Sequence, residues 1–290
     1  MAKGAVKFNN LTRNSAQRLI LQKSFKRFLL SGYYILDQEV KNFEREFARY
    51  LGAKYCIGVG NGQEALQISL MALGIKDGDE VITTPISAMA TTLAILAVGA
   101  KPVFVDTRSD GLIDPDLIPS VITKKTKAIL PVHLYGNAID LDKILKMCKK
   151  YYLYLIEDAC QAHGSEYQGR KLGTFGTFGC FSFYPTKNLG AFGDGGVIVT
   201  NSKNLAQICY EIRDYGQKSQ YNHVRYGLNS RLDELQAALL REELKNLDGD
   251  NNKRKKLCLK YIKHLSSSQA VPGPYVTGSN FHLFVIKTKQ

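Results

Sequence analysis

One lysine of the sequence stands where its side-chain amine could act as a nucleophile. Lys187 follows the apolar run 180–184 and lies in a glycine-rich turn, with the hydroxyls of Ser182 and Thr186 nearby. A lysine in a partly desolvated pocket has a lowered pKa, so that its free amine can attack an aldehyde carbon. Most turn lysines are simply exposed, but the apolar approach and the flanking hydroxyls favour the reactive role here.

Two earlier segments have the composition of ligand-binding turns. In residues 58–64 an apolar run passes through glycines into a helix, whose first free amides suit a phosphate group. The spacing matches neither GxGxxG nor a Walker loop, and a simple tight turn explains it equally well. In residues 154–164, Glu157 and Asp158 end an apolar strand and point to opposite faces. Asp158 is equally suited to a helix N-cap.

The three segments together supply the parts that pyridoxal 5'-phosphate (PLP) requires. They offer an anchor for the phosphate, an acid to keep the pyridine nitrogen protonated, and an amine for a Schiff base. The combination is far more specific than any one of its members. It predicts a PLP enzyme that holds its cofactor on Lys187.

The sequence also resembles the DegT/DnrJ/StrS family of PLP-dependent sugar aminotransferases, which have the aspartate-aminotransferase fold (PLP fold type I). Six segments carry the resemblance, in the family's order and over nearly the whole chain. They are SGYYIL (31–36), GNGQEAL (60–66), PVHLYG (131–136), EDACQAHG (157–164), SFYPTKNLG (182–190) and GLNSRLDELQAA (227–238).

The resemblance implies a role for individual residues on the ring side of the cofactor. Lys187 would form the Schiff base and afterwards move protons. Asp158 would pair with the pyridine nitrogen, and Gln161 would donate a hydrogen bond to the phenolic oxygen of the ring. Met89 stands where relatives have an aromatic residue stacked on the ring, and a thioether can still contact a ring favourably.

The resemblance also implies how the cofactor phosphate is held. Ser182 would bind it together with the backbone amides of Gly62 and Gln63. Asn229 would reach the phosphate of the neighbouring subunit's cofactor, which implies a homodimer.

The implied reaction moves an amino group from L-glutamate or glutamine, through pyridoxamine phosphate, to a nucleotide-linked keto-deoxysugar, as in deoxyaminosugar and polysaccharide biosynthesis. PLP-dependent dehydration of a keto-sugar is a second interpretation, but relatives of that kind have histidine in place of Lys187. A third is a truncated, catalytically silent protein that acts through dimerisation or regulation. Its support is that relatives continue well past residues 282–286.

The elements that must position these residues alternate along the chain. Short apolar runs, expected to be strands, alternate with helix-length segments, which predicts a three-layer α/β/α fold with a mainly parallel sheet. Ligands of such sheets lie beyond the carboxyl ends of the strands. The expected strands are 55–59, 80–83, 102–106, 128–132, 152–158, 180–184 and 197–200, and the expected helices between them are 64–73, 88–98, 115–122 and 141–149.

The remaining segments complete the predicted domain organisation. Residues 1–245 are expected to form a large PLP-binding domain, with a helical lead at 15–30 and 39–50 and a long helix at 231–247. Residues 246–290 are expected to start a small C-terminal domain that is incomplete, with a final strand at 282–286.

Composition excludes several classes of protein. The six cysteines of the 290-residue chain are scattered and form no CxxC, so we expect no metal site, no disulfide framework and a cytoplasmic protein. The net charge is +13, but no recognition motif accompanies it and the run 253–256 fits a solvated helix face, so we expect no nucleic-acid partner. The most apolar stretch, 86–100, falls short of the roughly 20 residues of a membrane span, so no membrane partner is expected.

Overall fold

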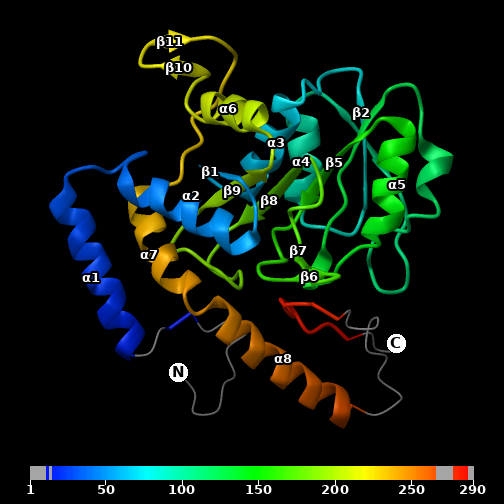
Figure 1. Cartoon of the computed structure of the whole chain (residues 1–290). Helices are drawn as coiled ribbons and strands as arrows, with labels where there is room; N and C mark the ends of the chain where they lie inside the picture. The colour runs from blue at the N-terminus through cyan, green and yellow to red at the C-terminus, as the bar shows by residue number, and fades with distance from the viewer. Residues whose placement is uncertain (1–10, 13–14, 266–276, 287–290) are drawn as a thin grey trace.

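The computed structural model describes residues 11–12, 15–265 and 277–286. Its centre is a seven-stranded sheet in which β9 lies antiparallel to both of its neighbours, and the five strands from β8 to β3 are parallel. The prediction of a mainly parallel sheet is confirmed. In spatial order the strands are β1 (Tyr55–Val59), β9 (Gly196–Thr200), β8 (Phe178–Ser182), β5 (Tyr154–Asp158), β4 (Thr126–Ile129), β2 (Glu80–Thr83) and β3 (Lys101–Phe104) (Figure 1).

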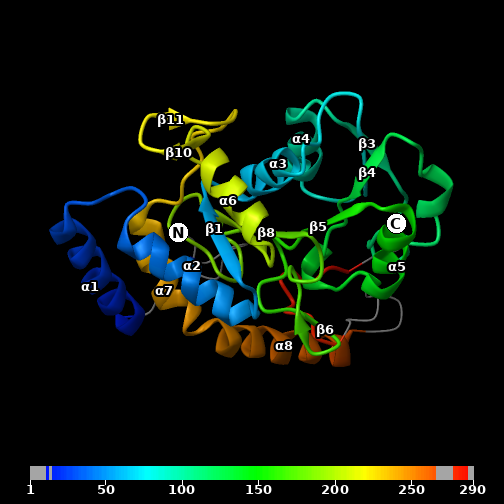
Figure 2. The same cartoon turned by 45° about the horizontal axis from the view of Figure 1, so that its top comes forward.

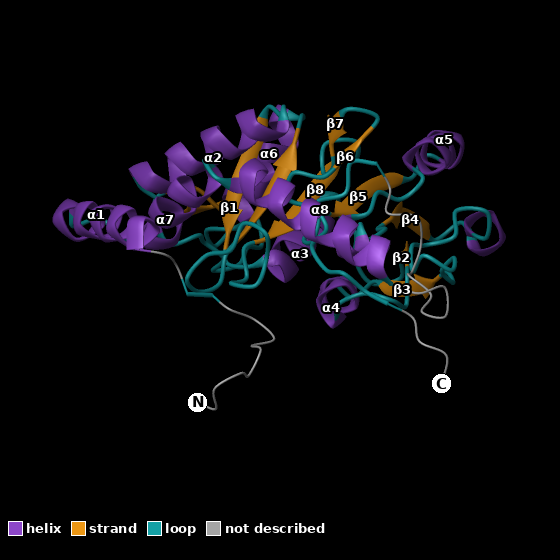
Figure 3. Cartoon of the chain, turned by 90° about the horizontal axis from the view of Figure 1, so that it is seen from below, coloured by secondary structure: helices purple, strands orange, loops and turns teal. Residues whose placement is uncertain are grey.

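Helices cover both faces of this sheet, as the predicted three layers require. One face packs against α3 (Gly62–Ala72), α4 (Met89–Ala97) and α6 (Lys203–Ile212). Of these, α3 and α4 lie below the sheet in Figure 3. The other face packs against α2 (Gln38–Leu51), α5 (Leu141–Tyr151) and α7 (Glu234–Leu244). Each face therefore has its own apolar cluster, because successive strand residues point to opposite sides.

Two further helices lie outside these layers. The first, α1 (Ser15–Ser31), contacts α7 at one edge of the molecule, and α8 (Leu247–His264) runs along its lower side in Figure 1. The C-terminal run 279–286 lies beside α8, and the ring of Phe284 stacks on that of Tyr261 with centroids 5.3 Å apart (Figure 2). None of the described helices is long and apolar enough to cross a membrane.

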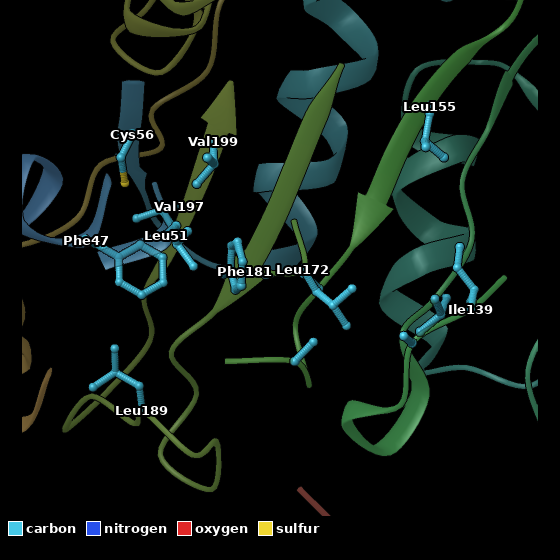
Figure 4. Packing of buried hydrophobic residues seen from close by; sticks show 14 of the residues in the cluster. Phe47, Leu51, Cys56, Ile139, Leu155, Leu172, Phe181, Leu189, Val197 and Val199 are labelled. Atoms are coloured by element: carbon cyan, nitrogen blue, oxygen red, sulfur yellow. The ribbon is translucent and has the colours of Figure 1, made fainter. Parts of the chain in front are cut away.

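Aromatic packing anchors the segment that follows β8. Phe181 and Phe183 meet the ring of Phe47 in α2 edge-on, at centroid distances of 5.3 and 5.5 Å, and Leu189 is also buried in this cluster (Figure 4). Edge-to-face pairs of this kind add about 0.5–1.5 kcal/mol each beyond the burial of area. The turn that carries Lys187 is therefore held in the core on both sides, by Phe183 before it and Leu189 after it.

Three expected elements differ from the structure. The expected α-helix 115–122 is wrong: only the 3-10 helix Ile118–Val121 forms there, since Pro119 lacks the amide that a longer helix needs. The expected strand 282–286 is also wrong, because the amide of His282 bonds to Tyr135 O instead of a neighbouring strand. The expected helix 231–247 ends at Leu244, and α8 begins at Leu247. The domain boundary at 245/246 falls at this junction and stays a prediction.

The two acids that end β5 have different surroundings, and Glu157 belongs to the scaffold. Its side chain is fully buried and accepts hydrogen bonds from the amides of Gly173, Phe175 and Gly176 at 2.7–2.9 Å. Its other neighbour is His133, whose Nε2 lies 2.9 Å from Oε2. These bonds fasten the segment 173–176 to the end of β4 across the sheet. Asp158 points to the opposite face, as strand alternation predicted.

We expect Glu157→Gln to destabilise the fold. The new amide group would face backbone donors and leave at least one of them unpaired, which costs about 1–3 kcal/mol for each buried group. Urea denaturation should therefore show a fall of about 2–4 kcal/mol in the free energy of unfolding. Glu166→Gln is the matched control. Among the described residues Glu166 pairs with Lys171 alone, and its carboxylate is 41% exposed. Equal losses in the two variants would contradict this role of Glu157.

Candidate active site

Asp158 is a buried carboxylate that lacks a cationic partner among the described residues. It is 5% exposed, accepts a hydrogen bond from Thr91 Oγ1 at 2.8 Å, and accepts another from the amide of Cys160 at 3.1 Å. Thr91 is held in turn by Ser87, with 2.7 Å between the hydroxyl oxygens. A buried charge ordinarily needs an opposite charge beside it. Asp158 is therefore placed to hold a cationic group of a ligand.

The thiol of Cys160 shows that the predicted site residues converge. Burial, and then the negative charge of Asp158, raise the pKa of Cys160, while the positive charge of Lys187 acts in the opposite direction. A Cβ added to Gly62 would lie 2.9 Å from Cys160 Sγ and 2.7 Å from Ser182 Cβ. Residues of three segments thus lie near one thiol: Gly62, Asp158, and the pair Ser182 and Lys187.

The first turn of α3 has the geometry of an anion-binding site. The side chain of Asn61 caps the helix by accepting a hydrogen bond from the amide of Glu64 at 2.9 Å. The amides of Gly62 and Gln63 precede it in the same turn, where backbone donors and the helix dipole favour a negative charge. Ser182, at the end of β8, lies against this turn because Gly62 has no side chain.

Lys187 opens onto a cavity of about 760 Å³. Asn188, Arg254 of α8 and His282 also line this cavity. Lys187 makes no ion pair with any residue in the described part of the chain, and its positive charge lowers the pKa of both His163 and His282, behind burial as the larger cause. The amine therefore lies between the buried carboxylate side of the site and a space large enough for a substrate.

Gln161 is oriented by the backbone. Its Oε1 accepts a hydrogen bond from the amide of Tyr135 at 2.7 Å, and Tyr135 adopts a left-handed conformation with φ of 59°. This bond assigns the oxygen of the side-chain amide, so that Nε2 is left as a donor on the other side.

Two predicted residues lie at the rim. Met89, the first residue of α4, is 68% exposed, while Thr91 two positions later turns toward Asp158. Asn229 is exposed and pairs with Asp214 in an isolated bridge, next to Ser230, whose Oγ accepts a hydrogen bond from the amide of Gly60. The stacking role of Met89 and the reach of Asn229 into a second subunit stay predictions.

The sequence analysis missed Thr91, Asn188 and Arg254, and assigned His282 only to a strand. Thr91 sits one helical turn from the predicted start of its helix, so a signal for it existed once Asp158 had been chosen. Nothing local marks the other three, because their neighbours in the cavity come from distant segments. In the part of the chain that the structure describes, no group of acidic, histidine or cysteine side chains could hold a metal ion.

Comparison with known proteins identifies the family. The model of the DegT/DnrJ/EryC1/StrS aminotransferase family matches residues 18–290. The chain belongs to this family. Its members are PLP-dependent, and the chain is accordingly a PLP-dependent aminotransferase.

Relatives of this DegT-family chain include enzymes of amino-sugar synthesis. It is 43% identical to the dTDP-3-amino-3,4,6-trideoxy-alpha-D-glucose transaminase of Streptomyces venezuelae, over 91% of this chain and 71% of that protein. It is 47% identical to the dTDP-3-amino-3,6-dideoxy-alpha-D-galactopyranose transaminase of Aneurinibacillus thermoaerophilus, over 93% and 75%. The crystal structure of NtdA from Bacillus subtilis, solved with bound PMP, superposes with a TM-score of 0.93 at 34% identity, covering 100% of this chain and 68% of that one.

The residues of this DegT-family site fit PLP. Asp158 lacks a cation that a protonated pyridine nitrogen would supply, and the first turn of α3 offers amides for the phosphate. The close approach of Gly62 to Ser182 leaves no room for a Cβ, as a phosphate cradle requires. Lys187 lies within electrostatic reach of the same thiol as Asp158. An amine, an acid and an anion site thus all lie near the thiol of Cys160.

Gly62→Ala should weaken PLP binding. Its Cβ would lie 2.7 Å from Ser182 Cβ, so the first turn of α3 must move away from Ser182. We expect the dissociation constant of PLP, measured by titration of the visible absorption band, to rise by about tenfold or more, which is the loss of one or two charge-assisted hydrogen bonds. Gly249→Ala is the matched control, because a Cβ at this position of α8 meets nothing within 4 Å. Equal affinities in the two variants would exclude the cradle.

Proposed function

We propose that the chain transfers an amino group from L-glutamate or glutamine to the keto group of a nucleotide-linked deoxysugar, with its cofactor held on Lys187. The observation that carries the proposal is the surroundings of Asp158, a buried carboxylate without a cationic partner among the described residues. It lies near the same thiol, Cys160, as Lys187 and the Gly62 turn. The names of the relatives, which are transaminases of dTDP-linked sugars, support the substrate class.

When bound, PLP supplies an electron sink for the carbanion that forms at the reacting carbon of the substrate. Asp158 keeps the pyridine nitrogen protonated, and Thr91 holds the Asp158 carboxylate in place through the 2.8 Å bond to its Oδ2. Gln161 Nε2 donates a hydrogen bond to the phenolic oxygen, since Tyr135 already occupies Oε1. These residues fix the ring in the site.

Lys187 moves the proton. Its Nζ would take a proton from the reacting carbon of the amino donor and return it to the cofactor carbon on the other side of the transferred nitrogen, as a general base and then acid. No ion pair with a described residue holds this nitrogen away from the substrate. Ser182 Oγ and the amides of Gly62 and Gln63 hold the phosphate, and Met89 covers the ring from the start of α4.

The two other interpretations lack a specific observation in their favour. Dehydration of a keto-sugar would have histidine in place of Lys187. A catalytically silent protein would have no need of a buried acid without a cation and of a lysine in the same site. Both are tested by the first experiment below.

The first experiment adds L-glutamate to the full chain loaded with PLP. We expect a visible absorption band of the lysine-bound cofactor, its loss on conversion to pyridoxamine phosphate, and its return with a nucleotide keto-sugar. Lys187→Ala should show no such band and a rate of conversion lower by on the order of 10³-fold or more. Lys203→Ala, at an exposed position of α6, should behave as the wild type. The proposal would be contradicted if the wild-type chain showed no such band, or if no nucleotide keto-sugar restored the band after its loss.

We further propose that the active unit is a homodimer in which Asn229 binds the phosphate of the partner's cofactor. The exposure of Asn229 beside the glycine turn at Gly60 leaves its amide available to another chain.

Mixing two inactive variants tests the homodimer. Lys187→Ala and Asn229→Ala chains, unfolded and refolded together, should regain about a quarter of the wild-type activity, because each mixed dimer then has one intact site. Each variant refolded alone is the control and should stay inactive. If Asn229 serves its own subunit, the mixed dimers contain no intact site and no activity returns.

A further inference from the structure

Asn188, the residue after Lys187, joins three segments that are far apart in the sequence. Its Nδ2 donates hydrogen bonds to Asn251 Oδ1 in α8 at 2.8 Å and to the backbone oxygen of Asn280 at 3.1 Å. Its Oδ1 lies 2.9 Å from His282 Nδ1. The neighbour of the reactive lysine is therefore fastened to α8 and to the C-terminal run.

Backbone groups fix the orientation of each amide in this network. Asn251 Nδ2 donates to the carbonyl of His163 at 2.9 Å, so Asn251 Oδ1 is the atom that faces Asn188. Asn280 Nδ2 donates to the carbonyls of Gln161 and His163 at 3.0 Å, and its Oδ1 accepts from the amide of His282. Carbonyl oxygens only accept and backbone amides only donate, so no side-chain amide here can be turned over.

The network decides which nitrogen of His282 carries the proton. Asn188 Nδ2 is committed to two acceptors, one of them a backbone carbonyl, so Asn188 Oδ1 must accept from His282 Nδ1. Nδ1 therefore bears the hydrogen. In a neutral imidazole the other nitrogen, Nε2, then has a free lone pair and is an acceptor.

His282 is neutral at physiological pH. Burial, and then the positive charges of Lys187 and Arg254, lower its pKa to about 3. The ring is 7% exposed and lines the same cavity of about 760 Å³ as Lys187. The cavity thus contains a hydrogen-bond acceptor of fixed position beside the reactive amine.

The charges around this acceptor select its donor. Five charged residues line the cavity: Lys187, Glu243, Asp250, Lys253 and Arg254. The charges that act on His282 itself are those of Lys187 and Arg254. Arg254 is half-buried and makes no hydrogen bond or ion pair with the described residues. Two positive charges disfavour an ammonium group at this place. We therefore expect the donor to His282 Nε2 to be a neutral hydroxyl. A substrate with both a hydroxyl and a negative charge would also match the positive charge of Arg254.

We propose that His282 Nε2 accepts a hydrogen bond from a hydroxyl of the sugar bound over Lys187, and that Asn188 is a positioning residue that holds His282 in the required tautomer. The role of the sugar rests on the function proposed above. The tautomer rests on the hydrogen bonds alone.

The tautomer can be measured without any turnover. The full chain labelled with ¹⁵N-histidine should give, for His282, a protonated Nδ1 and an unprotonated Nε2 from pH 5 to 8, with the signals assigned by their absence in a His282→Asn variant. A nucleotide keto-sugar should shift the Nε2 resonance. A protonated Nε2, or an imidazolium in this range, would overturn the proposal.

Two substitutions separate the two nitrogens of His282. In His282→Asn the amide nitrogen replaces Nδ1 and keeps the bond to Asn188, but the acceptor is lost. In His282→Gln the amide reaches the place of Nε2 and keeps an acceptor there, but the bond to Asn188 is lost. An unpaired hydroxyl should lower the affinity for the nucleotide keto-sugar by about tenfold in His282→Asn, with a smaller loss in His282→Gln. Calorimetric titration measures both.

Two controls identify what the lone pair serves. In His282→Asn the conversion by L-glutamate and the affinity for the nucleoside diphosphate alone should stay within about twofold of the wild type, because neither uses the sugar hydroxyl. If the rate of conversion by L-glutamate falls as much as the affinity for the keto-sugar, the lone pair of Nε2 serves Lys187. If the affinity for the nucleoside diphosphate falls as much, the lone pair binds the nucleoside. Either outcome overturns the proposed contact with the sugar. If the wild type binds no keto-sugar, the proposed function is contradicted. If the wild type binds a keto-sugar and His282→Asn binds it equally well, only the role of His282 is contradicted.

Discussion

Asp158 keeps a carboxylate inside the protein with two neutral donors and no cationic side chain of the described chain beside it. Moving an ion out of water costs several kcal/mol even after the surroundings relax. Glu157, one residue earlier, meets the same difficulty on the opposite face, but three backbone amides and His133 surround it. The fold therefore stabilises one acid completely and leaves the other for a ligand. In the function proposed above, a protonated pyridine nitrogen would supply the missing charge, so that binding of PLP would also stabilise Asp158.

The position of Asp158 in the sheet determines where the other groups must be. β8 lies directly beside β5, so Ser182 and the turn with Lys187 emerge next to the acid. β9 separates β8 from β1 and is antiparallel to both, which brings the end of β1 and the start of α3 to the same edge. The residues proposed to hold the phosphate, the ring nitrogen and the aldehyde carbon of PLP therefore lie along one edge of the sheet, as expected for ligands beyond the carboxyl ends of parallel strands.

The residues of the site that directly follow a strand could be predicted from the sequence. The residues in other places could not. Lys187, Asp158 and Gly62 each follow an apolar run, and the alternation of Glu157 and Asp158 needs only the period of a strand. Met89 is predicted from the resemblance to relatives, but in the structure it is Thr91 that contacts Asp158. The periodicity of a strand or a helix does not predict this contact. Residues 282–286 have the composition of a strand, yet their backbone bonds go to Tyr135 and Asn280. Contacts across 94 positions, such as that of Asn188 with His282, leave no local pattern.

The site thus has two sides that are built differently. The cofactor side uses backbone amides and strand ends, which the sheet holds rigid. The cavity side uses asparagine side chains whose orientation is set by backbone carbonyls of the turn after β5, so it is positioned relative to Asp158 and Gln161 through bonds rather than through the sheet. Preorganised groups of this kind lose little freedom when a substrate binds. The bonds hold the side chain of Asn188, whereas the side chain of Lys187 makes no ion pair with the described residues. The turn is therefore fixed next to a lysine that can still move, as the role proposed for Lys187 requires.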